Sequence, residues 1–133
     1  MPRRTASLAF PALILTATLA QADGPRISLI FGSDALNAAP EDIRSVRRID
    51  EGDRGSALVI RLSDSFDRLM FDLTSAHVGE TGKLLICNQL AVEPYLNAPI
   101  TVAQFVISDT DIARVDALQA LLDGPRCAAN PDS

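Results

Sequence analysis

The chain has 133 residues, 12 of them basic and 17 acidic, which gives a formal net charge of −5. This length has room for one small domain, and a hydrophobic content of 47% excludes a disordered chain. The acidic balance argues against nucleic acid and anionic membranes as partners. One histidine and two cysteines are too few for an ordinary zinc site, and no motif of nucleophilic catalysis or phosphate binding is present. We therefore expect no catalytic residue, no metal ligands and no cofactor.

Residues 1–22 have the pattern of a secretory signal peptide. Arg3 and Arg4 form a positive start, an uncharged apolar stretch follows, and Ala20-Gln21-Ala22 has the small-x-small form of a cleavage site. The apolar stretch is shorter than the about 20 residues that a membrane span takes, although an uncleaved anchor is the alternative. The sequence therefore predicts a periplasmic protein with no stable membrane insertion after cleavage. It also predicts one domain over 23–127 and a flexible tail over 128–133.

Short apolar runs separated by turn residues divide the rest of the chain into strands and helices. The pattern predicts one helical turn at 38–43, helices over about 63–79 and 108–124, and strands at 27–31, 45–50, 57–62, 82–87, 91–95 and 101–107. Loops are expected at 51–55 and 88–89. This order predicts an α+β fold, in which a mostly antiparallel β-sheet has two helices packed on one face.

The apolar positions of these elements predict the core. Alternation along 57–62 puts Leu58, Ile60 and Leu62 on the inner face of a strand. Other strands and the helical spacing complete the expected core with Phe66, Leu69, Leu73, Leu85, Ile107, Val115, Leu118 and Leu122.

The two cysteines, Cys87 and Cys127, both lie in the part of the chain expected after signal cleavage. In an oxidising compartment an even pair of cysteines is most simply a disulfide. The alternatives are two free thiols, or a catalytic cysteine that takes His77 as its base.

Three further features are candidate sites. His77 closes the apolar face of its predicted helix and is a candidate general base or pH sensor, or a histidine favoured by the helix dipole. The segment Glu93-Pro94-Tyr95-Leu96 is a candidate sheet edge for binding a peptide, although the proline alone would blunt such an edge. The acidic residues Asp109, Asp111 and Asp116 lack the spacing of a calcium-binding loop and favour helix capping instead.

Four segments carry a family resemblance: 73–79 (LTSAHVG), 82–86 (GKLLI), 90–96 (LAVEPYL) and 121–124 (LLDG). In this order they resemble the head subdomain of the first periplasmic domain of SecD and SecDF, accessory proteins of Sec-dependent secretion. The chain departs from that pattern at His77, where the family usually has asparagine, and in its two cysteines. The family's membrane part, which couples to proton flow, has no counterpart in the sequence. The resemblance thus implies the fold, the periplasmic side and a polypeptide-binding habit, and not the motor role.

These observations together predict a non-enzymatic periplasmic module that binds a protein or peptide, with a link to protein export implied by the resemblance. The alternative is a small structural or inhibitory protein that acts on an envelope enzyme. An enzyme is the third hypothesis and would depend on His77. The sequence identifies neither the partner nor the oligomeric state.

Overall fold

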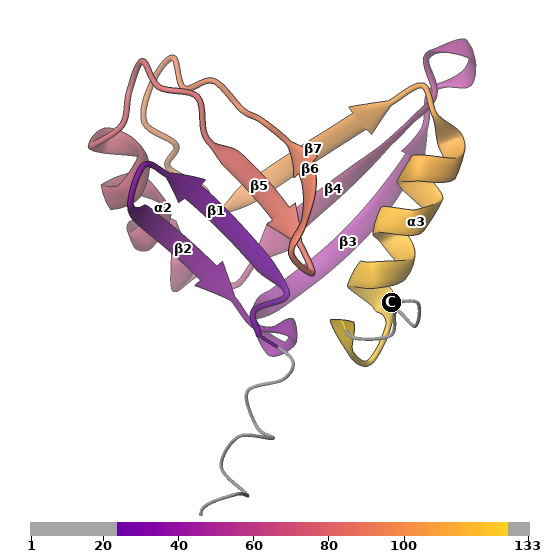
Figure 1. Cartoon of the computed structure of the whole chain (residues 1–133), viewed down its shortest axis with the longest axis horizontal. Coiled ribbons are helices and arrows are strands. Elements are labelled where there is room, and N and C mark those ends of the chain that lie inside the picture. Colours follow the sequence, from indigo (N-terminus) through magenta and orange to yellow (C-terminus); the bar gives the residue numbers. More distant parts are fainter. Residues whose placement is uncertain (1–23, 128–133) are drawn as a thin grey trace, which may run out of the picture.

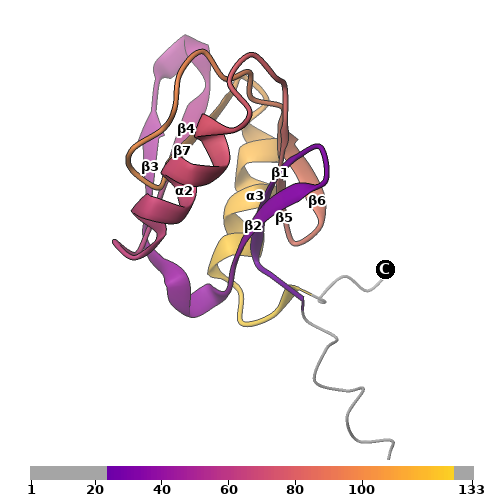
Figure 2. The ribbon, with the colours of Figure 1, turned by 90° about the vertical axis from the view of Figure 1, so that its left-hand side faces the viewer.

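The computed structural model describes residues 24–127, and over that range seven strands form two antiparallel sheets. The four-stranded sheet has the order β2-β1-β5-β6, and the three-stranded sheet has the order β3-β4-β7. Two α-helices lie at opposite ends of the space between the sheets (Figure 1 and Figure 2). The elements are β1 (Ile27–Phe31), β2 (Asp34–Ala38), β3 (Ile43–Asp50), β4 (Ser56–Leu62), α2 (Phe66–Ser75), β5 (Lys83–Ile86), β6 (Gln89–Val92), β7 (Gln104–Asp109) and α3 (Ile112–Asp123).

The predicted α+β class, with antiparallel strands and two helices, is confirmed. The strands divide into two sheets, however, where the sequence analysis expected one sheet with both helices on one face. The reason is that β5 pairs with β1, far away in the sequence, and not with β4. A hydrophobic pattern indicates which side chains face the core, but it does not indicate which strand becomes the neighbour.

Strand β2 was absent from the sequence-based prediction. Its residues are Asp-Ala-Leu-Asn-Ala, and alanine, aspartate and asparagine are all depleted in strands. The strand forms because it pairs along its whole length with β1, after a turn at Gly32-Ser33. The predicted helical turn before β3 is present as a short 3-10 helix at Pro40–Asp42.

The core lies between the two sheets and includes side chains from both helices. The predicted burial of the β4 face and of Ile107, Val115, Leu118 and Leu122 is confirmed, because each of these side chains is at most 6% exposed. Phe66 and Leu73 are partly buried against the same cluster.

Two predicted core residues are wrong. Leu69 is 53% exposed, because α2 instead turns Met70 and Thr74 inward. The hydroxyl of Thr74 donates to the carbonyl of Met70 at 2.7 Å and accepts from the backbone N–H of Ile100 at 2.8 Å, so its burial leaves no hydrogen bond unmade. Leu85 is only half-buried, because β5 alternates and places its two neighbours in the core.

The turn between β5 and β6 is one residue earlier than expected. Its central residues are Cys87 and Asn88, with φ angles of 49° and 65°. Positive φ at both central positions is the geometry of a type I′ hairpin, whose twist matches that of the flanking strands.

Two element boundaries differ from the prediction. Strand β6 ends at Val92, before the predicted end at Tyr95. Helix α3 begins later than the predicted residue 108, and its cap is Asp111.

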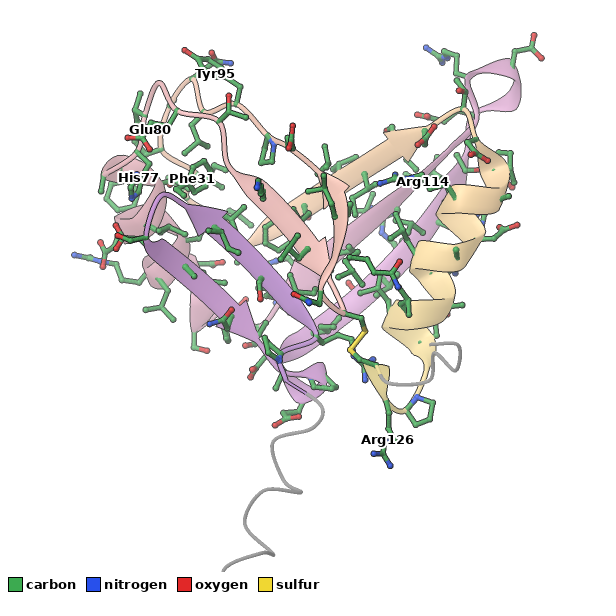
Figure 3. The ribbon with its side chains drawn as sticks, in the orientation of Figure 1. Phe31, His77, Glu80, Tyr95, Arg114 and Arg126 are labelled. Atoms are coloured by element: carbon green, nitrogen blue, oxygen red, sulfur yellow. A yellow bond between two sulfur atoms is a disulfide. The ribbon has the colours of Figure 1, made fainter. Side chains whose placement is uncertain are left out.

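The two cysteines are joined. The Sγ atoms of Cys87 and Cys127 lie 2.05 Å apart and their Cα atoms 5.2 Å apart, so the bridge connects the β5–β6 turn to the segment after α3 (Figure 3). This arrangement excludes the two alternatives of free thiols and a catalytic cysteine.

The predicted signal peptide (1–22) and tail (128–133) lie outside the described residues. None of the helices within 24–127 combines the length and the apolar character that a membrane span requires.

Candidate functional site

An apolar groove opens between β6 and β7, the edge strands of the two sheets. Its volume is about 170 Å³. One wall comes from β6 and the residues after it, and the other from β7. Its lining residues are Leu29, Phe31, Leu84, Val92, Pro94, Leu96, Ile100, Gln104, Phe105 and Val106.

The outer edge of β7 presents backbone groups to this groove. The backbone N–H of Leu62 donates to the carbonyl of Ala103 at 3.0 Å, which fixes the residues of β7 that bond to β4. Because hydrogen-bonded and non-hydrogen-bonded pairs alternate in an antiparallel ladder, Val106 and Ser108 direct their N–H and C=O groups away from β4. Val106 lines the groove and is 56% exposed. An additional strand would therefore find both hydrogen-bonding groups and an apolar surface along β7.

The edge of β6 is partly covered by α3. Nη2 of Arg114 donates to the carbonyls of Leu90 and Ala91, at 2.9 and 2.8 Å (Figure 3). Arg114 is held in place by Asp109, whose Oδ2 lies 3.2 Å from its Nη1. This contact occupies carbonyl groups that an added strand would otherwise use, so β7 is the more accessible of the two edges.

The predicted peptide-binding edge, Glu93 to Leu96, forms part of the groove wall. The carbonyl of Pro94 accepts from the N–H of Gly82 at 2.8 Å, and the N–H of Leu96 donates to the carbonyl of Glu80 at 3.0 Å. The segment thus pairs with the chain before β5. Pro94 and Leu96 line the groove, whereas Glu93 is exposed and Tyr95 is 58% exposed.

His77 lies next to this groove through its contact with Phe31. The two rings stack with centroids 5.5 Å apart and planes inclined by 18°, and Phe31 is a lining residue (Figure 3). Gly82 allows the close packing of Phe31, because a Cβ at this position would lie 2.5 Å from Cε1 of the phenyl ring.

Two carboxylates hold the ring of His77. Nε2 lies 2.8 Å from Oδ2 of Asp34, and Nδ1 lies 2.8 Å from Oε1 of Glu80. The hydrogen bond with Asp34, followed by that with Glu80, raises the pKa of His77 above its ordinary value. Because both ring nitrogens face carboxylates, neither is available to take a proton from a substrate, which argues against the general-base role.

The three acidic residues near the start of α3 have separate partners. The side chain of Asp111 accepts from the N–H of Arg114 and caps the helix. Asp116 forms an ion pair with Arg48 at 2.6 Å, and Asp109 pairs with Arg114. Within the described residues, no group of three or more histidine, cysteine, aspartate or glutamate side chains is placed to hold a metal ion.

Two solved structures of SecDF share this arrangement of strands and helices. SecDF in its super-membrane-facing form matches 67% of this chain with a TM-score of 0.54 and 13% identity. The fold is SecD-like. A second structure, titled as a SecDF membrane component that enhances protein export, matches 92% of this chain and 73% of that chain, with a TM-score of 0.57 and 9% identity. This chain spans only 12% of the length of the first. No protein-family model and no curated protein sequence matches the chain.

The SecD-like fold accounts for the order of the segments that carry the resemblance. Segment 73–79 contains the end of α2 and His77. Segment 82–86 contains β5 and, before it, Gly82, which packs against Phe31. Segment 90–96 contains most of β6 and the residues of the groove wall that follow it. Phe31, Val106 and Arg114 were not identified as site residues from the sequence. The alternation of Phe105, Val106 and Ile107 contained a signal for an exposed Val106, but no sequence pattern indicates where Arg114 points.

Proposed function

We propose that this chain is a non-enzymatic periplasmic module that binds an extended segment of another protein. The observation that carries the proposal is the apolar groove beside the free edge of β7. An extended peptide that adds to this edge would exchange hydrogen bonds with Val106 and Ser108. It would also place every second side chain in the groove, since side chains alternate along a strand.

The periplasmic location is supported by the disulfide between Cys87 and Cys127, because disulfides persist in oxidising compartments. The signal-peptide pattern of residues 1–22 agrees with it. A link to protein export is supported by the SecD-like fold, since one of the similar structures is described as enhancing protein export.

The non-enzymatic character is supported by how the reactive side chains are engaged. Both ring nitrogens of His77 face carboxylates, and Cys87 is bonded to Cys127. The groove is lined almost entirely by apolar side chains, which suits binding and offers no group for proton transfer.

The test measures the affinity of the oxidised protein for a fluorescent peptide of alternating valine and threonine, by fluorescence anisotropy. A peptide with proline at alternate positions is the control ligand, because it lacks the N–H groups that a strand edge requires. Val106→Asp should weaken binding of the valine-threonine peptide by at least about tenfold, since it puts a charge in the groove. Ile49→Asp is the matched control variant.

Ile49 lies on β3, at the opposite edge of the same sheet, and is 39% exposed, so the same charge there should leave binding unchanged. Equal affinity for the two peptides would contradict strand addition. Unchanged affinity of Val106→Asp would contradict the groove as the site.

A further inference from the structure

His77 connects two separate segments of the chain. Asp34 begins β2, directly after the β1–β2 turn, and Glu80 lies in the loop between α2 and β5. The His77 side chain is only 13% exposed, and Figure 3 shows it beside Phe31 and Glu80, far from α3. The ring is thus a side-chain link between the hairpin tip and the loop, next to the pairing of β1 with β5 at Ile30 and Lys83.

The hairpin carries a lining residue of the groove, and the loop contacts another. Phe31 is fully buried, lines the groove and pairs with Asp34 across the β1–β2 turn. Glu80 accepts, through its backbone carbonyl, the N–H of Leu96, which lines the groove as well. A change in the contacts of His77 therefore acts on two lining side chains.

Only the protonated ring can make both contacts. An imidazolium has two N–H donors, whereas a neutral imidazole has one donor and one lone pair. When His77 is neutral, one of the two carboxylates faces that lone pair and its hydrogen bond is lost. The charged groups that face the ring are Asp34, from β2, and Glu80, from the loop after α2, while β1 contributes the uncharged Phe31.

We propose that His77 is a pH-operated clasp, which in its protonated form holds the β1–β2 hairpin against the loop after α2 and in its neutral form releases them. Release loosens Phe31 and Leu96 and with them the groove. The effect on peptide binding rests on the proposed function, but the clasp itself requires no ligand.

The direction with pH follows from the raised pKa of His77. The clasp is fully formed below the ordinary histidine pKa of 6.5, and it is lost as the pH rises through the raised pKa of the folded protein. For each unit by which the pKa is raised, the opening equilibrium grows about tenfold between the acid and alkaline limits.

The test follows the oxidised protein by NMR across neutral pH. The Cε1–H signal of His77 gives its midpoint, and amide hydrogen exchange at Gly32–Asp34 and Gly79–Glu80 reports opening. We expect a midpoint above 6.5 and, beyond it, exchange that increases more than base catalysis alone explains. A midpoint at or below 6.5 overturns the clasp.

Two variants separate the clasp from general packing. His77→Gln is neutral at every pH and should remove the exchange step, and an unchanged profile in this variant overturns the clasp. Asp34→Asn removes the carboxylate that contributes most to the raised pKa of His77 and should shift the midpoint to lower pH. An unshifted midpoint also overturns it. Arg68→Gln, an exposed change on α2, is the control that should leave the profile as in the unaltered protein.

Affinity for the valine-threonine peptide, measured on both sides of the midpoint, tests the regulatory role. A loss of affinity above the midpoint that is absent in His77→Gln supports it, and equal affinity on both sides overturns it. An exchange step with no peptide binding at any pH supports the clasp and rejects the proposed function.

Discussion

Nη1 of Arg26 lies 2.9 Å from the carbonyl oxygen of Gly124, 98 residues further along the chain. The same nitrogen donates to the carbonyls of Leu121 and Leu122, at 3.2 and 3.0 Å. The last carbonyls of a helix have no partner inside the helix and attract a positive charge. Arg26 is only 3% exposed, so the residue that precedes β1 serves as a buried cap for the end of α3.

The first prediction concerns this cap. Arg26→Met keeps an apolar stem of similar reach but leaves the carbonyls at the end of α3 without their donor. We expect the free energy of unfolding, measured in urea, to fall by about 1–3 kcal/mol. Arg68→Met is the control, because Arg68 makes an exposed pair with Asp72 on α2 and such pairs contribute about 0–1 kcal/mol. Equal losses in both variants would reject the capping role.

The parts of the fold that the sequence predicts are those with a strong local pattern. The inner faces of β4 and α3 were predicted correctly, because each buries a continuous apolar row. Leu69 was wrongly placed in the core because a polar residue, Thr74, occupies an inner position of α2 that its two hydrogen bonds make favourable. Strand β2 was missed because its pairing with β1, and not its composition, makes it a strand.

The candidate site was predicted in part for a related reason. The predicted segment with Pro94 and Leu96 forms one wall of the groove, but the second wall comes from β7, in the other sheet. The carboxylates around His77 come from a hairpin tip and from a loop three residues later. Glu80 lies three residues after His77 in the sequence, so this contact could have been predicted locally. Asp34 becomes a neighbour of His77 only through the pairing of β1 with β2.

The second prediction compares a buried leucine of α3 with an exposed leucine of α2. Leu118 is 4% exposed in α3, and Leu118→Ala should lower the free energy of unfolding by about 2–5 kcal/mol, as for other buried leucines. Leu69→Ala is the matched control, because Leu69 is 53% exposed and its loss should cost under about 0.5 kcal/mol. Thermal or urea unfolding measures both. A large loss at Leu69 would mean that another surface covers it.

The third prediction concerns acid stability. Oδ1 of Asp67 accepts from the backbone N–H of Ala103 at 2.8 Å and lies 3.0 Å from Nη1 of Arg61, so it joins α2 to strand β4 and to the residue before β7. The bond from Ala103, and then that from Arg61, lowers the pKa of Asp67 below its ordinary value of 3.8. Its contribution to stability is therefore present above pH 3.8 and is lost as the pH falls through the lowered pKa.

Asp67→Asn should consequently be less stable than the unaltered protein at neutral pH, and the difference should shrink in acid. Urea unfolding over a descending pH series measures this difference. Asp72→Asn, on the exposed side of α2, should show no such convergence. Parallel stability curves for Asp67→Asn and the unaltered protein at every pH would contradict the role assigned to the carboxylate.

The last prediction concerns the disulfide. The bridge spans a sequence separation of 40 residues, and by the chain-entropy model a loop of this size stabilises a fold by about 4 kcal/mol. It also fastens the segment after α3 to the β5–β6 turn, where the N–H of Cys87 donates to the carbonyl of Arg26 at 2.9 Å. Reduction should therefore lower the unfolding free energy and, because the cap at Arg26 adjoins the bridge, reduce amide protection first in the final turn of α3.

Thiol labelling and hydrogen exchange check these expectations together. The oxidised native protein should not react with a thiol reagent until it is reduced. The double variant Cys87→Ala, Cys127→Ala should match the reduced protein in stability and be insensitive to reductant. Labelling of both sulfurs in the native, unreduced protein would contradict the bridge. A uniform loss of protection over the whole chain on reduction would show instead that the bridge stabilises the domain as a unit, and not the end of α3 through Arg26.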